Sequence, residues 1–212
     1  MSKSSPYTSA FTACSFLYSD FNNVLPILKS ENSDVLLKEE VVNRNFLKVN
    51  NETSAKRILH EFKRRYLSVP KVFWDWYETL DETAQKVALL YVIIKTYKLI
   101  FDFHIHVTIK KWNSVDHTLT ADDLHLELLD ISARDEFVDS WSDVTKKKIM
   151  SSYLTILRQA EMLDVKTNDL RPIRLLPNEY YYYIESGETW FLDACLLASV
   201  EKENIINAYK ML

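Results

Sequence analysis

The sequence predicts an all-α protein, mostly helical with minor β structure, and three observations lead to this class. There is a single glycine among 212 residues, whereas hairpin turns and nucleotide-binding loops depend on glycine. Apolar residues recur at intervals of three and four, which is the period of an amphipathic helix. A central run, 84–111, is apolar nearly all round and predicts a buried core helix. With 47% hydrophobic residues, the chain is able to bury a sizeable core.

Residues 1–78 are expected to form a first module with the outline of a helix-turn-helix. A first helix is predicted over 6–23, ending before Pro26, because proline interrupts a helix. A second helix is predicted over 33–45 and a third over 54–68, with a polar turn between them. In a helix-turn-helix the second helix of the motif enters a DNA major groove.

The predicted third helix has an apolar face and a basic face. The apolar stripe contains Ala55, Ile58, Leu59, Phe62, Tyr66 and Val69. The opposite face carries Lys56, Arg57, His60, Lys63 and Arg64. Lys and Arg are the residues that neutralise phosphates, so this face is a candidate nucleic-acid contact.

The aromatic segment 72–77 is expected to begin a short helix that packs on the central bundle. Its two tryptophans are of a type that stacks on bases in single-stranded nucleic acid. Large rings between helices more often belong to the core, because they dominate the energy of burial. We therefore interpret this cluster as core.

Residues 79–115 are predicted to form the central core helices. Thr79 and Glu82 have the spacing of a capping box, which places the helix start near Leu80. A break into two helices is expected near 97–102. Charged residues interrupt the apolar run too often for a membrane span: Lys86, Lys95, Lys98 and Asp102.

Residues 116–212 are expected to contain an acidic connector and a second, winged-helix-like module. The stretch 116–143 holds nine acids and one base. We interpret it as a solvated connector, with mimicry of DNA charge or contact with a basic partner as the alternative. Thr120 and Asp123 predict a helix N-cap within it.

A long helix is predicted over 144–163, after a cap at 142–143, and it also has two faces. Its apolar stripe contains Ile149, Met150, Tyr153, Ile156, Leu157 and Ala160. The other side shows Lys147, Lys148, Ser151, Thr155, Arg158 and Gln159. A DNA-reading helix needs Lys and Arg for phosphates and hydroxyl or amide groups for phosphates or base edges. A merely solvated face is the alternative interpretation, although such faces tend to mix both signs of charge.

Two stretches, 54–62 and 145–153, align without a gap. Each has a hydroxyl residue, two bases, two apolar residues and an aromatic residue at matching positions. This internal similarity predicts two related modules that flank one buried bundle.

The rest of the chain is expected to complete the second module. Residues 168–176 predict a turn and an extended segment, where a winged helix places its wing, and they carry Arg171 and Arg174. Pro177 to Glu179 has the form of a helix start, whereas Tyr180 to Tyr183 has strong strand propensity. We interpret the segment as a short helix that ends near Gly187. Two terminal helices should then pack back on the core.

Nothing in the sequence indicates an enzyme or a cofactor, and no catalytic residue is expected. There is no Walker A loop, HExxH or GxSxG motif. His104 and His106 are the nearest approach to a metal site, but on a helix they lie about 200° apart and do not chelate together. The two cysteines lack zinc-site spacing and suit a reducing cytoplasm. The start of the chain has no apolar signal region, which favours a cytoplasmic location.

The order of these features resembles the BrxA family of bacterial BREX phage-exclusion systems. The resemblance is carried by 45–47, 53–57, 62–67, 145–148, 156–163 and 173–177. It covers nearly the whole chain and implies a small helical fold that has been likened to the NusB antitermination fold. It also implies a non-enzymatic, DNA-binding component that acts beside methyltransferase, ATPase and phosphatase-like subunits. Carried over to this sequence, it points to the same two basic helices, at 56–65 and 147–158.

The leading hypothesis is therefore double-stranded DNA binding, mainly to phosphates. The expected contacts are Lys56, Arg57, Lys63, Arg64, Lys147, Lys148 and Arg158, with Ser151, Thr155, Arg171 and Arg174 as secondary contacts. The net charge of −4 argues, taken alone, against a nucleic-acid binder, but the bases are segregated into blocks. An assembly adaptor that docks on acidic proteins and an RNA-binding, NusB-like factor are the alternatives.

Overall fold

The computed structural model describes residues 4–211 and confirms the all-α class. No β-strand forms within this range, where β pairing takes the form of two isolated bridges, Thr118 with Asp169 and Leu163 with Leu170. The helices are η1 (Ala10–Ala13), α1 (Tyr18–Lys29), α2 (Ser33–Asn43), α3 (Glu52–Leu67), α4 (Lys71–Tyr77), α5 (Glu82–Thr96), α6 (Lys98–Asp102), the π-helix η2 (Phe103–Thr108), α7 (Ile109–Trp112), α8 (Ala121–Ser132), α9 (Glu136–Asp139), α10 (Asp143–Gln159), η3 (Pro177–Tyr180), α11 (Tyr181–Glu185), α12 (Trp190–Ala194) and α13 (Ser199–Lys210).

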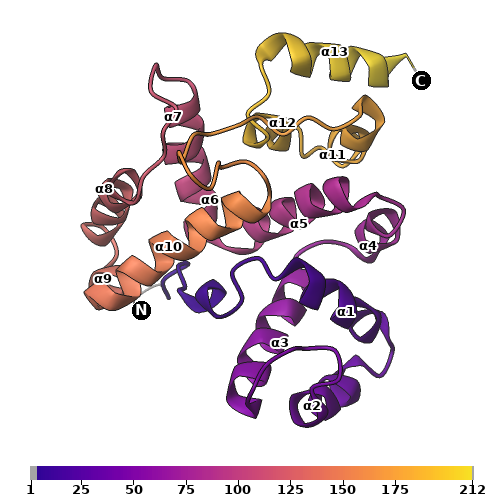
Figure 1. Ribbon diagram of the computed structural model, residues 1–212. Helices are drawn as coiled ribbons and strands as arrows, with labels where there is room; N and C mark the ends of the chain where they lie inside the picture. The colour runs from indigo at the N-terminus through magenta and orange to yellow at the C-terminus, as the bar shows by residue number, and fades with distance from the viewer. Residues whose placement is uncertain (1–3, 212) are drawn as a thin grey trace.

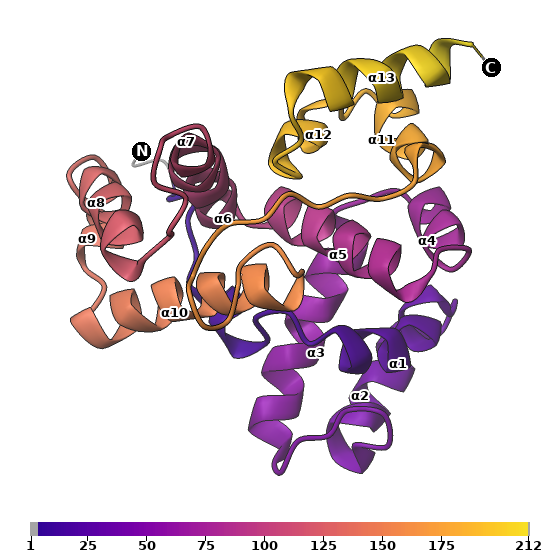
Figure 2. The same ribbon diagram turned by 45° about the horizontal axis from the view of Figure 1, so that its top comes forward.

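Helix α5 lies at the centre of the molecule, with groups of helices around it (Figure 1, Figure 2). Helices α1 to α3 lie on one side, α8 to α10 on a second and α11 to α13 on a third. All residues of 87–94 are buried, which confirms the predicted core helix. One hydrophobic cluster extends from Phe11 to Ile205 and includes residues from each of the three predicted segments.

The predicted first helix over 6–23 is wrong. A 3-10 turn, η1, forms first, and the backbone then turns sharply because Ser15 and Leu17 have positive φ angles of 35° and 48°. Helix α1 begins at Tyr18 and continues through Pro26, where a stop was expected. Residues on both sides of the proline are buried, and their burial outweighs one lost backbone hydrogen bond.

The second and third helices were predicted correctly to within a few residues. The Asn51 side chain caps α3 by accepting a hydrogen bond from the Ser54 N–H at 2.8 Å. A buried acid, Glu40, closes the loop before it. Its carboxylate accepts hydrogen bonds from three consecutive backbone N–H groups, those of residues 45, 46 and 47, at 3.2, 2.9 and 2.9 Å.

The capping residue predicted for the central helix is wrong. Asp81 caps α5 by accepting from the Ala84 N–H at 2.8 Å, whereas the Thr79 hydroxyl donates to the Trp76 carbonyl. The predicted break is confirmed at Tyr97, whose φ and ψ of −119° and 108° are not helical. In the described part of the chain, no helix combines the length and the apolar character that crossing a bilayer demands.

The C-terminal elements follow the prediction with one difference. Thr120 and Asp123 form the expected capping box, and Ser142 caps α10. The short helix is present as η3 and α11, and it ends at Glu185, two residues before Gly187, whose φ is +76°. The extended segment 168–176 is also present, but it pairs with the rest of the chain through two isolated bridges rather than through the hairpin of a wing.

Candidate nucleic-acid interface

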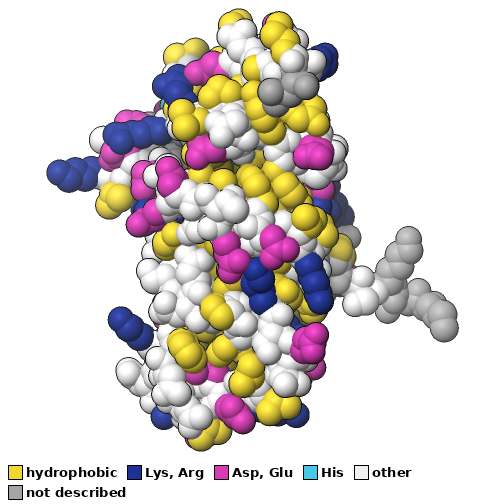
Figure 3. All heavy atoms as spheres, turned by 90° about the vertical axis from the view of Figure 1, so that its right-hand side faces the viewer, with side chains coloured by type: hydrophobic (Ala, Val, Ile, Leu, Met, Phe, Trp, Pro, Cys, Tyr) yellow, Lys and Arg dark blue, Asp and Glu magenta, His cyan; other side chains and the backbone are white. Residues whose placement is uncertain are grey.

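The two predicted basic helices both pack on the N-terminal turn. Helices α3 and α10 each contact η1, and their N-terminal halves point away from it in different directions (Figure 1, Figure 2). On the right-hand side of Figure 1, away from α8 to α10, Lys and Arg side chains are scattered among acidic and hydrophobic ones (Figure 3). The described residues of that face (Figure 3) form no concentrated basic patch, and the candidate interface is sought on α3 and α10, which carry the predicted basic residues.

The apolar stripe of α3 is buried as predicted, and its basic side chains lie on the outside. Lys56, Arg57, His60 and Arg64 are exposed, and Lys63 is half-buried. A groove of about 300 Å³ lies beside them, between α3 and η1. It is lined by Ala10, Ala13, Lys56, Arg57, His60 and Glu61.

The cations of α3 differ in their partners. Lys63 forms an ion pair with Asp34, and Arg64 lies 3.9 Å from the buried carboxylate of Glu61. Lys56 and Arg57 form no ion pair with any residue of the range 4–211. These two side chains are the ones on α3 that are available to an external anion.

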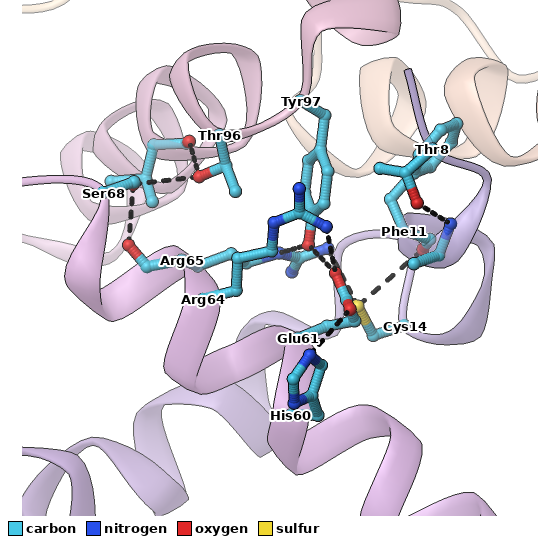
Figure 4. A network of polar contacts seen from close by, with 12 residues as sticks. Thr8, Phe11, Cys14, His60, Glu61, Arg64, Arg65, Ser68, Thr96 and Tyr97 are labelled. Atoms are coloured by element: carbon cyan, nitrogen blue, oxygen red, sulfur yellow. Dashed lines mark hydrogen bonds and ion pairs between the residues drawn. The ribbon is translucent and has the colours of Figure 1, made fainter. Parts of the chain in front are cut away.

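Arg65 belongs to the implied basic stretch 56–65, but it points inward and is fully buried (Figure 4). Its guanidinium donates hydrogen bonds to the carbonyls of Phe16, at 3.0 Å, and Ser15, and to Cys14 Sγ at 3.0 Å. Burial raises the pKa of the Cys14 thiol, so the thiol stays neutral beside this cation. Arg65 therefore anchors the segment between η1 and α1 instead of contacting a ligand.

The network continues from Arg65 to Tyr97 and Glu61. Arg65 Nε lies 3.4 Å from the Tyr97 hydroxyl, which donates to Glu61 Oε2 at 2.8 Å. Burial raises the pKa of Tyr97 and keeps it a donor. The sequence patterns do not predict this inner network. A signal for it is Glu61, an acid among the bases of 56–65 that lies at helical spacing from the buried Ile58 and Arg65.

Helix α10 also buries its predicted apolar stripe. Lys147, Lys148 and Ser151 are exposed and Thr155 is half-buried. The hydroxyls of Ser151 and Thr155 donate to carbonyls of their own helix, at 3.0 and 2.8 Å, which leaves their lone pairs free to accept. Neither Lys147 nor Lys148 forms an ion pair within the described residues.

Three predicted contact residues form hydrogen bonds or ion pairs within this chain: Arg158, near the end of α10, and Arg171 and Arg174, in the extended segment after it. Arg158 Nη2 donates to Asn168 Oδ1 at 2.7 Å. Arg171 pairs with Asp164 at 2.5 Å and Arg174 with Glu201 at 2.9 Å. Backbone N–H groups and these arginines lower the pKa of both carboxyls, so both pairs are charged at neutral pH. These arginines are less available than the lysines at the start of the helix.

His104 and His106 do not share a ligand. His104 is buried in the π-helix, where Nε2 donates to the Ala194 carbonyl at 2.8 Å and Nδ1 accepts from the Tyr153 hydroxyl at 3.0 Å. His106 Nδ1 lies 2.9 Å from Glu127. Across residues 4–211, no group of three or more potential metal ligands converges.

A curated relative, a solved structure and a family model each match most of this chain. The BREX protein BrxA of Bacillus cereus (strain H3081.97) is 26% identical over 163 residues, which cover 77% of this chain and 82% of that protein. A crystal structure of an uncharacterized protein from Magnetospirillum magneticum has the same fold, with a TM-score of 0.75 at 18% identity. The match covers 90% of this chain and 98% of that one. The family model described as BrxA matches residues 5–186, and the chain therefore belongs to the BrxA family.

Proposed function

We propose that this BrxA-family component of a BREX phage-defence system binds double-stranded DNA and has no enzymatic activity of its own. One observation carries the proposal. Four cations on two helices that pack on the same turn have no carboxylate partner within residues 4–211: Lys56, Arg57, Lys147 and Lys148. Unpaired cations are what phosphate contact requires, and each helix presents one pair of them in its N-terminal half.

The other predicted residues act around these four. Lys63 and Arg64 extend the face of α3, and Ser151 and Thr155 place hydroxyl oxygens on the face of α10. Arg158, Arg171 and Arg174 contribute only if their present partners release them. Binding on this scheme is mainly electrostatic and tolerant of sequence.

The test is the affinity for a labelled duplex at several salt concentrations. The logarithm of the affinity should fall with the logarithm of salt by about 0.9 per neutralised phosphate, so a slope of roughly −3 to −4 is expected from four contacts. Lys147→Glu with Lys148→Glu should weaken binding at least about tenfold and reduce the slope by about 2. Lys56→Glu with Arg57→Glu should do the same.

A matched control changes the net charge equally at another place. Lys71→Glu with Lys210→Glu reverses two exposed lysines on α4 and α13 and should leave affinity nearly unchanged. Equal weakening by the control pair would mean that only net charge matters. No binding at low salt would rule out the proposal.

Experiments on the same purified protein distinguish DNA binding from two alternative functions. An adaptor for other BREX subunits, in the cytoplasm, would explain cations that face outward from an acidic protein. It predicts co-purification with those subunits after nuclease treatment and no affinity for DNA. An RNA-binding role predicts that RNA displaces the duplex at lower concentration than unlabelled DNA does.

A further inference from the structure

Helix α8 has a second apolar stripe that nothing in the described chain covers. Its first stripe, Leu124, Leu128 and Ile131, is buried in the core. Leu126 and Leu129 lie three residues apart on another side, and they are 69% and 49% exposed. A helix that is apolar on two sides is typical of one that packs on the core and on a partner.

A groove of matching character lies between α2 and α3. It has a volume of about 340 Å³, and Leu37, Val41 and Leu59 give it an apolar lining. Its polar lining residues are Asp34, Lys38, Lys56, His60 and Lys63. With three lysines against one aspartate, the groove is positive around an apolar floor.

The surroundings of the exposed leucines have the opposite charge. Helix α8 itself carries four acids and no Lys or Arg, and two of these acids, Asp122 and Asp130, flank the leucines on its exposed side. Arg134 compensates Asp130 in part, at 3.3 Å. Asp122 is exposed and has no ion pair among residues 4–211. Lys110 and Lys111 lie on one side of Leu126, and Lys111 is held by Asp116 and Asp123. The ridge therefore has two leucines at its centre and a small net negative charge around them.

We infer that the α8 ridge of one copy of this chain docks in the α2–α3 groove of a second copy. Helix α8 and helix α2 lie far apart in both ribbon views, so the contact joins two molecules (Figure 1, Figure 2). Both halves of the match, apolar against apolar and acidic against basic, are carried by the same chain. Such a contact is head-to-tail, so it produces a ring or an open chain of copies.

This contact is separate from the proposed DNA binding, although Lys56 and Lys63 lie on both surfaces. Its tests therefore use residues outside the DNA-contact set. Oligomer mass is measured by sedimentation over a range of protein concentrations, without DNA and at low salt. The wild-type chain should grow in mass with concentration, and added salt should reduce the growth.

Two single substitutions place a charge in each half of the contact. Leu126→Glu on the ridge and Val41→Glu in the groove should each raise the concentration needed for association by roughly tenfold or more. Matched controls are Val165→Glu and Val42→Glu, at exposed valines outside both surfaces, and these should associate like wild type. Helical content by circular dichroism confirms that each variant is folded.

A charge exchange then tests whether the two surfaces meet. Lys38→Glu and Asp130→Lys should each weaken association, and an equimolar mixture of the two variants should recover it, because every groove then has a ridge of opposite charge. The inference is overturned if the wild type stays monomeric, if the mixture of the two charge variants associates no better than either variant alone, or if Leu126→Glu and Val41→Glu associate like wild type. Affinity for a short duplex should be the same for Leu126→Glu and wild type, which keeps this result distinct from the DNA proposal.

Discussion

The Tyr153 hydroxyl donates a hydrogen bond to Nδ1 of His104 at 3.0 Å, and this contact ties α10 to the central helices. The direction of the bond follows from the other ring nitrogen, which must donate to the carbonyl of Ala194. The Thr108 hydroxyl then donates to the Tyr153 oxygen at 2.6 Å. In this buried row of hydrogen bonds, Nδ1 of His104 must accept. A protonated His104 has no free lone pair, so the row is satisfied only while His104 is neutral.

The first prediction concerns acid stability. Burial lowers the pKa of His104 from its ordinary value of 6.5 to about 4. The unfolded chain therefore binds a proton at a pH where the folded protein does not, and stability falls as the pH drops from about 6.5 towards 4. The loss contributed by this group is about 3 kcal/mol. It is checked by urea unfolding at pH values across that interval.

His104→Gln should remove this part of the pH dependence, although it also lowers stability at neutral pH. His125→Gln changes an exposed histidine on α8 and should keep the full dependence. A slope between pH 6.5 and 5 that is the same in all three proteins would contradict the assignment.

The second prediction concerns the buried guanidinium of Arg65. Arg65→Met removes the donor to the carbonyls of Ser15 and Phe16 and to the Tyr97 oxygen, and it leaves these buried acceptors without that partner. A loss of about 3–5 kcal/mol in the free energy of unfolding is expected, because each unsatisfied buried acceptor costs about 1–3 kcal/mol. Arg57→Met, on the exposed face of the same helix, should change stability by less than about 0.5 kcal/mol. Equal effects of the two substitutions would mean that the network does not contribute to stability.

The third prediction concerns the loop between α2 and α3. Glu40→Ala leaves three backbone N–H groups without their acceptor and should cost about 2–3 kcal/mol in denaturant unfolding. Glu40→Gln retains one carbonyl oxygen and should cost less. Glu39→Ala, at the exposed neighbour, is the control and should be nearly neutral. A neutral Glu40→Ala would show that the loop does not need this acceptor.

The fourth prediction rests on the proposed DNA binding. Asp164→Asn with Glu201→Gln should release Arg171 and Arg174 from their ion pairs while keeping an acceptor for the backbone N–H groups. Affinity for duplex DNA should rise by about two- to fivefold at moderate salt, with a steeper salt dependence. Asp169→Asn removes a charge nearby but leaves both pairs intact. An unchanged affinity in the double variant would place these arginines outside the interface.

Local sequence signals predicted most of the helices, and they predicted which side of α3 and of α10 is buried. The stripes of α3 and α10 were predicted in full because each repeats at helical spacing over several turns. The errors fall where a local rule competes with packing. Pro26 does not end α1, because both of its neighbouring turns are buried, and Asp81 rather than Thr79 caps α5 because the chain turns once more before the helix starts.

The sequence by itself determined the all-α class, the buried central helix, the two outward basic faces and the resemblance to the BrxA family. These depend on composition and on contacts within one helix, which are local in the chain. Tertiary structure alone decided that Arg65 points inward, that Arg171 and Arg174 are paired with Asp164 and Glu201, and that both basic helices meet on η1. Arg65 and η1, like Arg174 and Glu201, lie tens of residues apart, and no helical period relates residues at that separation.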